Sequence, residues 1–282
     1  MRCTLQMKMG FVRPVRNGAA EPQRIRFYES GPIRYVEAPP PKDLAPDLVC
    51  FWNLRVDPSS PIHLQHVLPD LTVDVISRNG GPLLLLGPPT GAIRIPLRPG
   101  TVLEGARIRA GAARRLLHAS PADLLNAIVP LDDVLRAPLR QTAAAPDPHV
   151  DSIVSGLLRR SIVEHDLKLE STVRSAITWL GTNWRGSVED MSRHFNRSNR
   201  DLRRRFMAVV GMGPKLVQRM VRVQHALHVM SARTGNVSLS DLAFECGFAD
   251  QAHMTREVAR FTDHTPSGLR HLAHSTETVR AD

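Results

Sequence analysis

A chain of 282 residues, 42% of them hydrophobic, is long enough to form two domains and to bury an ordinary core. Its formal net charge of +10 favours an anionic partner, either nucleic acid or an acidic membrane. Cys3, Cys50 and Cys246 are far apart, which argues against a disulfide framework or a structural zinc site. The longest aliphatic run, 83–86, is too short to span a bilayer, and no secretory signal is visible. We therefore expect a cytoplasmic protein that does not bind membranes.

The first half of the chain is rich in proline and glycine, and its apolar residues occur in short runs. Such runs, separated by turn signals, are typical of β-strands. The predicted strands are 48–54, 63–68, 73–76, 83–86 and 93–95. We expect a mostly-β unit, preceded by a mobile tail around residues 38–41. A barrel or a cupin-like fold is one alternative for this unit.

Helical segments follow this β-rich part. We predict short helices over 112–117, over 121–128 behind a Ser120 cap, and over 130–139. Residues 143–148 have the composition of a linker. From residue 150 onward the apolar residues recur at helical spacing almost without interruption.

The first of two helix-turn-helix patterns spans residues 187–206. Ser187 is suited to cap a helix, Asn196 to form the turn and Ser198 to cap the next helix. On that second helix an apolar stripe lies opposite a strongly basic face. The basic residues are Arg197, Arg200, Arg203, Arg204 and Arg205, offset only by Asp201. Arginines on an exposed helix face can reach guanine or phosphate oxygens, although a solvated charged face is the simpler alternative.

One amphipathic helix is predicted between the two patterns. Gly211 is suited to end the preceding helix and Pro214 to begin the connector. Counted as residues 214–230, the connector would be a rod about 25 Å long at 1.5 Å rise per residue. One turn of DNA spans roughly 34 Å, so such a rod can hold two helix-turn-helix units near successive major grooves.

The second pattern spans residues 239–258. Ser238 or Ser240 is expected to cap its first helix, Gly247 to form the turn and Asp250 to cap its second helix. The face of that second helix opposite the core is less basic than in the first unit. Its expected DNA-contacting residues are Gln251, His253, Thr255, Arg256 and Arg260.

These residues resemble the AraC/XylS family of bacterial transcriptional regulators over about residues 172–270. The most specific stretch is 241–256, followed by Thr265-Pro266, and residues 202–206 and 211–215 are also typical. Asn196 stands where glycine is common in this family, and Val258 where phenylalanine is usual. More loosely, residues 66–76 and 105–113 resemble a β-rich sensor region found in one branch of the family.

The resemblance implies that both second helices enter the major groove of bent DNA. By motif position it implies contacts from Arg200, Arg203 and Arg204 of the first unit. From the second unit it implies contacts from Gln251, Thr255 and Arg256.

The predicted fold class is α+β, with a mostly-β N-terminal domain before an all-α double helix-turn-helix domain. We expect a β-rich sensor or dimerisation domain at 1–145, a linker helix at 146–170, the DNA-binding domain at 171–275 and a tail at 276–282. The expected function is sequence-specific transcriptional regulation without enzymatic activity, cofactor or metal. Its expected partners are double-stranded DNA and RNA polymerase, with a small-molecule effector and a homodimer left open.

Two other functions are alternatives to transcriptional regulation. A β-barrel, cupin-like enzyme with an appended helical module would need a metal site, but His63 and His66 would lie on opposite strand faces. An alkyl-transfer repair protein would need a cluster of thiolates, which Cys3 and Cys50 do not supply.

Three further pairs of polar residues have alternative explanations. We expect Asp70 and Asp74 to share a strand face, either as an acid/base pair or as a solvated or arginine-paired face. Arg107 and Arg109 are also expected to share a face and to hold either an anionic effector or those aspartates. For His225 and His228, packing explains the pair better than metal ligation.

Overall fold

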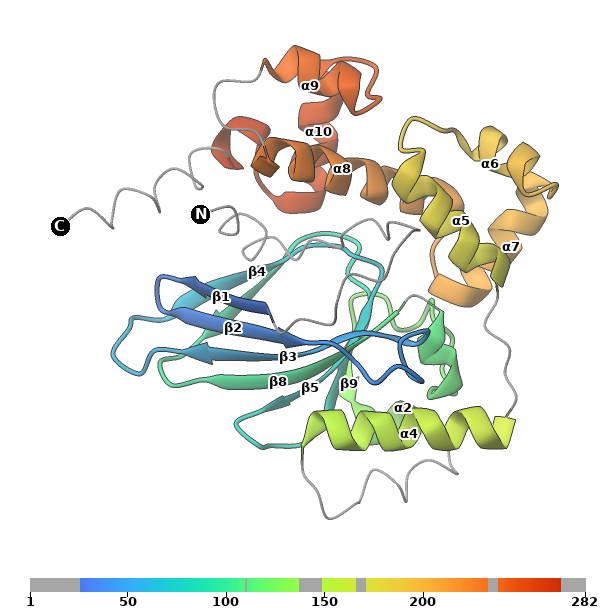
Figure 1. Cartoon of the computed structure of the whole chain (residues 1–282). Coiled ribbons are helices and arrows are strands. Elements are labelled where there is room, and N and C mark those ends of the chain that lie inside the picture. Colours follow the sequence, from blue (N-terminus) through green and yellow to red (C-terminus); the bar gives the residue numbers. More distant parts are fainter. Residues whose placement is uncertain (1–25, 110, 137–148, 166–170, 233–237, 270–282) are drawn as a thin grey trace.

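A computed structural model describes residues 26–109, 111–136, 149–165, 171–232 and 238–269 (Figure 1). A β-rich N-terminal part is followed by helices, so the predicted α+β class is confirmed. The predicted linker at 143–148 and tail at 276–282 lie outside the described residues. In the described helices no segment is both long and apolar enough to cross a bilayer.

The N-terminal part is built on an antiparallel sheet with strand order β1-β2-β3-β8-β5-β6-β9. A separate two-stranded ribbon pairs β4 with β7. The strands are β1 Arg26–Ser30, β2 Ile33–Ala38, β3 Leu48–Val56, β4 His63–Val67, β5 Val73–Arg78, β6 Leu84–Leu86, β7 Ile93–Leu97, β8 Val102–Ile108 and β9 Ile128–Pro130. Among these strands, β1 and β9 end the order without pairing to each other. The sheet is therefore open, and the alternative of a closed barrel is wrong.

All five predicted strands are present, but β1, β2, β8 and β9 were not predicted. The expected tail around 38–41 is wrong, because Ala38 ends β2 and Pro40 is buried. Central strand β8 lacks the usual run of large apolar residues. At Gly105 a Cβ atom would lie 2.2 Å from the Trp52 ring, so the small residue is required by packing across β3 and β8.

The predicted helix at 121–128 is wrong. The chain forms successive turns there, and Asn126 adopts a left-handed conformation with φ of 59°. The Asn126 side chain accepts hydrogen bonds from the backbone and hydroxyl of Thr90, at 2.8 and 3.1 Å. These tertiary bonds and the pairing of β9 with β6 replace the local helix.

The other two predicted short helices are shorter in the structure than the sequence predicted. The predicted helix at 112–117 is the 3₁₀ turn η1, Ala112–Arg115. Of the predicted 130–139, only α2, Leu131–Val134, is helical, and residues from 137 onward lie outside the described part.

The described residues from 149 onward form seven longer helices, and the first of them packs on the sheet. They are α4 Val150–His165, α5 Ser171–Thr182, α6 Val188–His194, α7 Asn199–Val210, α8 Pro214–Ala232, α9 Leu239–Glu245 and α10 Gln251–Thr262. Buried Val154 and Leu157 of α4 join a core that contains Val75 and Ile108 of the sheet. Figure 1 shows α4 along the side of the sheet opposite the remaining helices.

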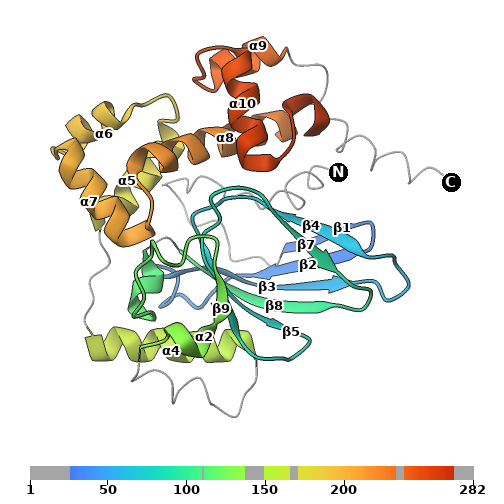
Figure 2. The same ribbon diagram turned by 180° about the vertical axis from the view of Figure 1, so that it is seen from behind.

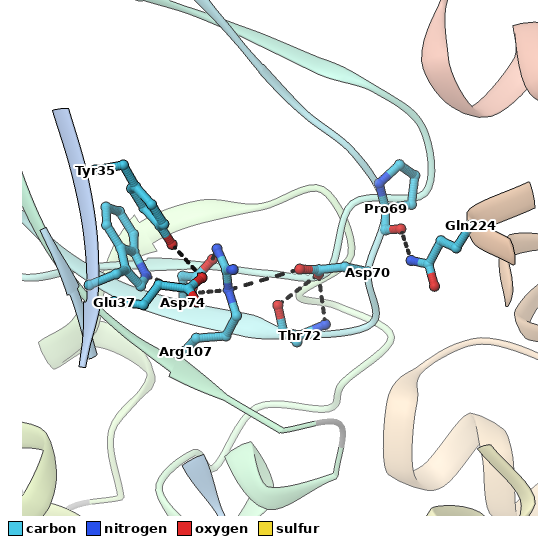
Figure 3. A network of polar contacts seen from close by, with 9 residues as sticks. Tyr35, Glu37, Pro69, Asp70, Thr72, Asp74, Arg107 and Gln224 are labelled. Carbon is cyan, nitrogen blue, oxygen red and sulfur yellow. Dashed lines mark hydrogen bonds and ion pairs between the residues drawn. The ribbon is translucent and has the colours of Figure 1, made fainter. Parts of the chain in front are cut away.

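The loop between β4 and β5 ties the sheet to the C-terminal helices. Leu68 and Leu71 are buried in the hydrophobic core of the helical part. Leu71 has φ of 66°, which is unusual for a large side chain, and this turn directs the loop against the helices. Gln224 of α8 donates a hydrogen bond to the Pro69 carbonyl, as Figure 3 shows. The two parts are therefore packed against each other by apolar and polar contacts.

Candidate nucleic-acid interface

The first helix-turn-helix unit is defined by its caps. The Ser187 hydroxyl accepts from the Asp190 backbone at 3.0 Å, and the Asp190 carboxylate accepts from the Ser187 backbone at 2.8 Å. This capping box starts α6. Asn196 then adopts φ of 48°, and Ser198 caps α7. Both predicted caps and the left-handed Asn196 turn are therefore present.

Helix α7 has one buried face and one basic face. Its buried residues are Leu202, Phe206, Val209 and Val210, as the apolar spacing predicted. The arginines around the other face are exposed at positions 197, 200, 203 and 204, whereas Arg205 is half-buried. Gly211 ends the helix at φ of 73°, in the left-handed region where glycine is favoured.

Asp201 divides these arginines into two groups. It accepts from Arg204 at 2.6 Å and from Arg205 at 2.8 Å, and Arg197 lies 4.0 Å away. Hydrogen bonds from Arg205 and then Arg204 lower the pKa of Asp201 below its ordinary value. In the described part of the chain, Arg200 and Arg203 have no such carboxylate partner. Their guanidinium groups are available to a ligand outside the protein.

The second unit repeats this construction. Ser238, one of the two candidate caps, caps α9; Gly247 turns the chain at φ of 74°; and Asp250 caps α10. Met254, Val258 and Phe261 are buried and form the core-facing side of α10. Val258, in place of the usual phenylalanine, is fully buried.

The predicted DNA-contacting residues of α10 differ in exposure. Gln251, Arg256 and Arg260 are exposed, whereas His253 and Thr255 are half-buried. The His253 ring contacts the Ala249 backbone nitrogen at 3.3 Å and lies edge-on to Phe248. Its ring is therefore engaged in the turn before the helix.

Contacts that the sequence did not reveal join the two units. Figure 2 shows α6 and α7 near one end of connector α8, and α9 and α10 near the other. Trp184 and Arg185, just before the first unit, donate hydrogen bonds to the Glu245 carbonyl at 3.2 Å each. Arg185 also reaches the Phe244 carbonyl at 3.0 Å. These bonds satisfy the carboxyl end of α9 and link one unit to the other.

Connector α8 holds α10 through a partly buried ion pair. Arg219 donates two hydrogen bonds to Glu257, at 2.6 and 2.7 Å. Glu257 sits between the buried Met254 and Val258. A lone carboxylate beside an apolar stripe is the signal that could have identified this pair.

The polar groups of the sheet form a structural network (Figure 3). Arg107 donates to Asp74 at 3.1 and 3.2 Å and lies 3.9 Å from Asp70. Asp70 lies before β5 and accepts from Thr72, so the expectation that it shares a strand face with Asp74 is wrong. Of the alternatives for these two aspartates, pairing with arginine is present, through Arg107.

The histidines also make structural contacts. His225 stacks on Trp184 with ring centroids 3.8 Å apart, and His66 lies 5.3 Å from His264. Burial, followed by the nearby His228, lowers the pKa of His225. In the part of the chain that the structure covers, no group of three or more potential metal-binding side chains is found.

Comparisons with known proteins agree with this geometry. Residues 191–271 match a family described as a helix-turn-helix domain, and residues 36–130 match a domain of unknown function, DUF6597. Over 117 residues the chain is 28% identical to the HTH-type transcriptional activator RhaS of Klebsiella pneumoniae and 26% identical to RhaS of Escherichia coli (strain SE11). Each match covers 40% of this chain and 41% of the relative.

Solved structures give partial similarity. A probable AraC family transcriptional regulator from Rhodopseudomonas palustris matches 36% of this chain and 97% of its own, with 23% identity and a TM-score of 0.33. ToxT from Vibrio cholerae matches 77% of this chain and 96% of its own, with 10% identity and a TM-score of 0.41.

The capped units and the connecting helix define a double helix-turn-helix domain of the DNA-binding class. The match at residues 191–271 and the similarity to RhaS support a DNA-binding domain of the AraC/XylS type in this part of the chain.

Proposed function

We propose that this protein is a sequence-specific, DNA-binding transcriptional regulator whose two helix-turn-helix units contact adjacent segments of the major groove. One observation carries the proposal: two capped units with exposed polar faces are joined by one continuous helix, α8, of 19 residues. At 1.5 Å rise per residue that helix is about 28 Å long, close to the roughly 34 Å of one DNA turn. A modest bend in the DNA brings the two lengths into agreement.

The proposed contacts follow from side-chain type and exposure. Arg200 and Arg203 have the strongest support in the first unit, because they are exposed and not held by Asp201. In the second unit Gln251 and Arg256 have the strongest support, because both are exposed. The remaining proposed DNA-binding residues are Arg197, Arg204, Arg205, His253, Thr255 and Arg260. His253 and Arg205 have the weakest support, because each is half-buried.

The rest of the assignment is also a proposal. We assign regulation or dimerisation to residues 1–145, a linker helix to 146–170 and DNA binding to 171–275. The proposed partners are promoter DNA, RNA polymerase, a small-molecule effector and a second copy of the chain. The RhaS relatives act in transcription, which supports a cytoplasmic location and a function without catalysis.

The test is selection of bound sequences from random DNA with the full chain, followed by affinity measurements on the selected site. Arg203→Ala and Arg204→Ala are each expected to weaken binding to that site by about 1–3 kcal/mol. Each should weaken binding to random DNA by less. Arg78→Ala, an exposed change on β5, is the control. Equal losses on both DNAs would argue against base recognition by α7, and failure to enrich any sequence would contradict the proposal.

A further inference from the structure

One large apolar side chain lies on the basic face of α7. Met207 is 38% exposed, whereas the four apolar residues of this helix that face the core are at most 6% exposed. Among the described residues, Met207 is neither a member of a hydrophobic cluster nor packed against one. The packing of the folded chain therefore does not account for a methionine at this position.

Met207 shares its face of α7 with the exposed arginines. At 100° per residue it lies about 20° around the helix axis from Arg200 and about 40° from Arg203. Arg204 lies about 60° away on the other side. Single apolar side chains are common on protein surfaces, and Val163 of α4, at 84% exposed, is one of them. Met207 differs because it lies among the groups proposed to contact DNA.

The chemistry of the major groove limits what this side chain can recognise. Base pairs present hydrogen-bond donors and acceptors there, together with one apolar group, the C5-methyl of thymine. A thioether donates no hydrogen bond and accepts only weakly, so the donors and acceptors give it little to bind. Apolar contact is the usual way in which a protein recognises the thymine methyl. Thymine is therefore the base that complements Met207.

The rise of the helix sets where this thymine would lie. Met207 is seven residues after Arg200 and four after Arg203, which gives rises of about 10.5 Å and about 6 Å. Base pairs follow one another at about 3.4 Å along the DNA axis. For a helix that lies along the groove, the two rises correspond to about three and about two base-pair steps. Arginine most often contacts guanine, so the thymine is expected two or three steps from a guanine.

We propose that Met207 recognises the 5-methyl group of a thymine, two or three base-pair steps from a guanine contacted by Arg200 or Arg203. Cytosine, the other pyrimidine, lacks this methyl group, so the contact selects against it at that position. The inference rests on the proposed function and deepens it, because it names a base that α7 selects and a residue that selects it.

The test uses the full chain and the DNA site that it enriches from random sequence. Uracil replaces each thymine of that site in turn, which removes only the 5-methyl group. Met207→Ala removes the apolar side chain, and Met207→Leu keeps an apolar side chain of similar size. Val163→Ala, an exposed apolar residue of α4 that is truncated in the same way, is the matched control. Affinities are measured by fluorescence anisotropy.

At one thymine, uracil should weaken binding of the wild type about fourfold, the equivalent of about 0.8 kcal/mol for one buried CH₂-sized group. The same change should not affect Met207→Ala, because the protein partner of the methyl group is absent. Met207→Leu and Val163→Ala should respond to uracil as the wild type does.

Three results would overturn the proposal. They are an enriched site with no thymine within three steps of a guanine, no effect of uracil at any thymine, and a full effect of uracil in Met207→Ala. A chain that enriches a sequence but gives one of these results still supports the proposed function. A chain that enriches no sequence contradicts both the proposed function and the role of Met207.

Discussion

Arg219 of α8 and Glu257 of α10 form a two-bond ion pair, with donor–acceptor distances of 2.6 and 2.7 Å. Their side chains are only 24% and 11% exposed. The planar guanidinium matches both carboxylate oxygens, so the pair fixes the orientation of α10 as well as its distance from the connector. The pair therefore adds a directional contact to the apolar core and to the Trp184 and Arg185 hydrogen bonds that also position the second helix-turn-helix unit.

Replacing this carboxylate should loosen the second unit. Glu257→Gln keeps the size of the side chain but removes its charge, leaving Arg219 in a partly buried site without its partner. We expect a loss of about 1–3 kcal/mol in the free energy of unfolding, measured by urea denaturation. Glu189→Gln, an exposed change in the first turn of α6, is the control. Equal losses in the two variants would show that the ion pair contributes nothing specific.

The same pair predicts a pH dependence. The hydrogen bonds from Arg219 are the main cause that lowers the pKa of Glu257 from its ordinary value of 4.5. A lowered pKa stabilises the folded protein fully above the unfolded value and progressively less as pH falls through the folded one. The stability difference between the wild type and Glu257→Gln should therefore be constant near neutrality and shrink below about pH 4.5. A difference that grows in acid would contradict this assignment.

Asp201 should restrain non-specific DNA binding. Asp201→Asn removes one negative charge and weakens the hold on Arg204 and Arg205. We expect tighter binding to random DNA and a salt dependence steeper by about one unit in log–log slope, measured by fluorescence anisotropy. Asp132→Asn makes the same charge change on exposed α2, away from the proposed interface. The prediction fails if both variants change the slope equally.

Leu71 combines a buried side chain with a left-handed backbone. Leu71→Ala should cost about 2–5 kcal/mol through lost packing between the two parts of the protein. Leu71→Gly loses the same contacts but relieves about 1–2 kcal/mol of backbone strain at φ of 66°. The glycine variant should therefore be at least as stable as the alanine variant in urea unfolding. At Leu68, which is buried in the same core, glycine should be the less stable of the two replacements.

The two described cysteines should be unreactive in the folded state. Cys50 and Cys246 are buried thiols, and burial raises the pKa of Cys50 to about 12. The thiolate is the reactive form, so neither residue should react with a disulfide reagent at pH 8 until the protein unfolds. Mass spectrometry of the labelled peptides measures this. Rapid labelling of Cys50 in the native protein would contradict its buried position.

The amino-acid sequence alone specified most of the C-terminal domain. Ser187, Ser198 and Asp250 each follow the local rules of helix capping, while Asn196, Gly211 and Gly247 occupy left-handed positions that those residue types favour. The buried stripes of α7 and α10 repeat with the period of a helix. These signals lie within a few residues of one another, so they are visible before any tertiary contact is known.

The tertiary structure decided what depends on residues far apart in the chain. Residues 121–128 have the composition of a helix, but Thr90 and the pairing of β9 with β6 hold them in turns and a strand. Gly105 lies in a central strand because it accommodates the Trp52 ring. The pair Arg219–Glu257 likewise joins separate segments. Local propensity cannot specify such contacts, because their free energy arises only when the folded chain brings the partners together.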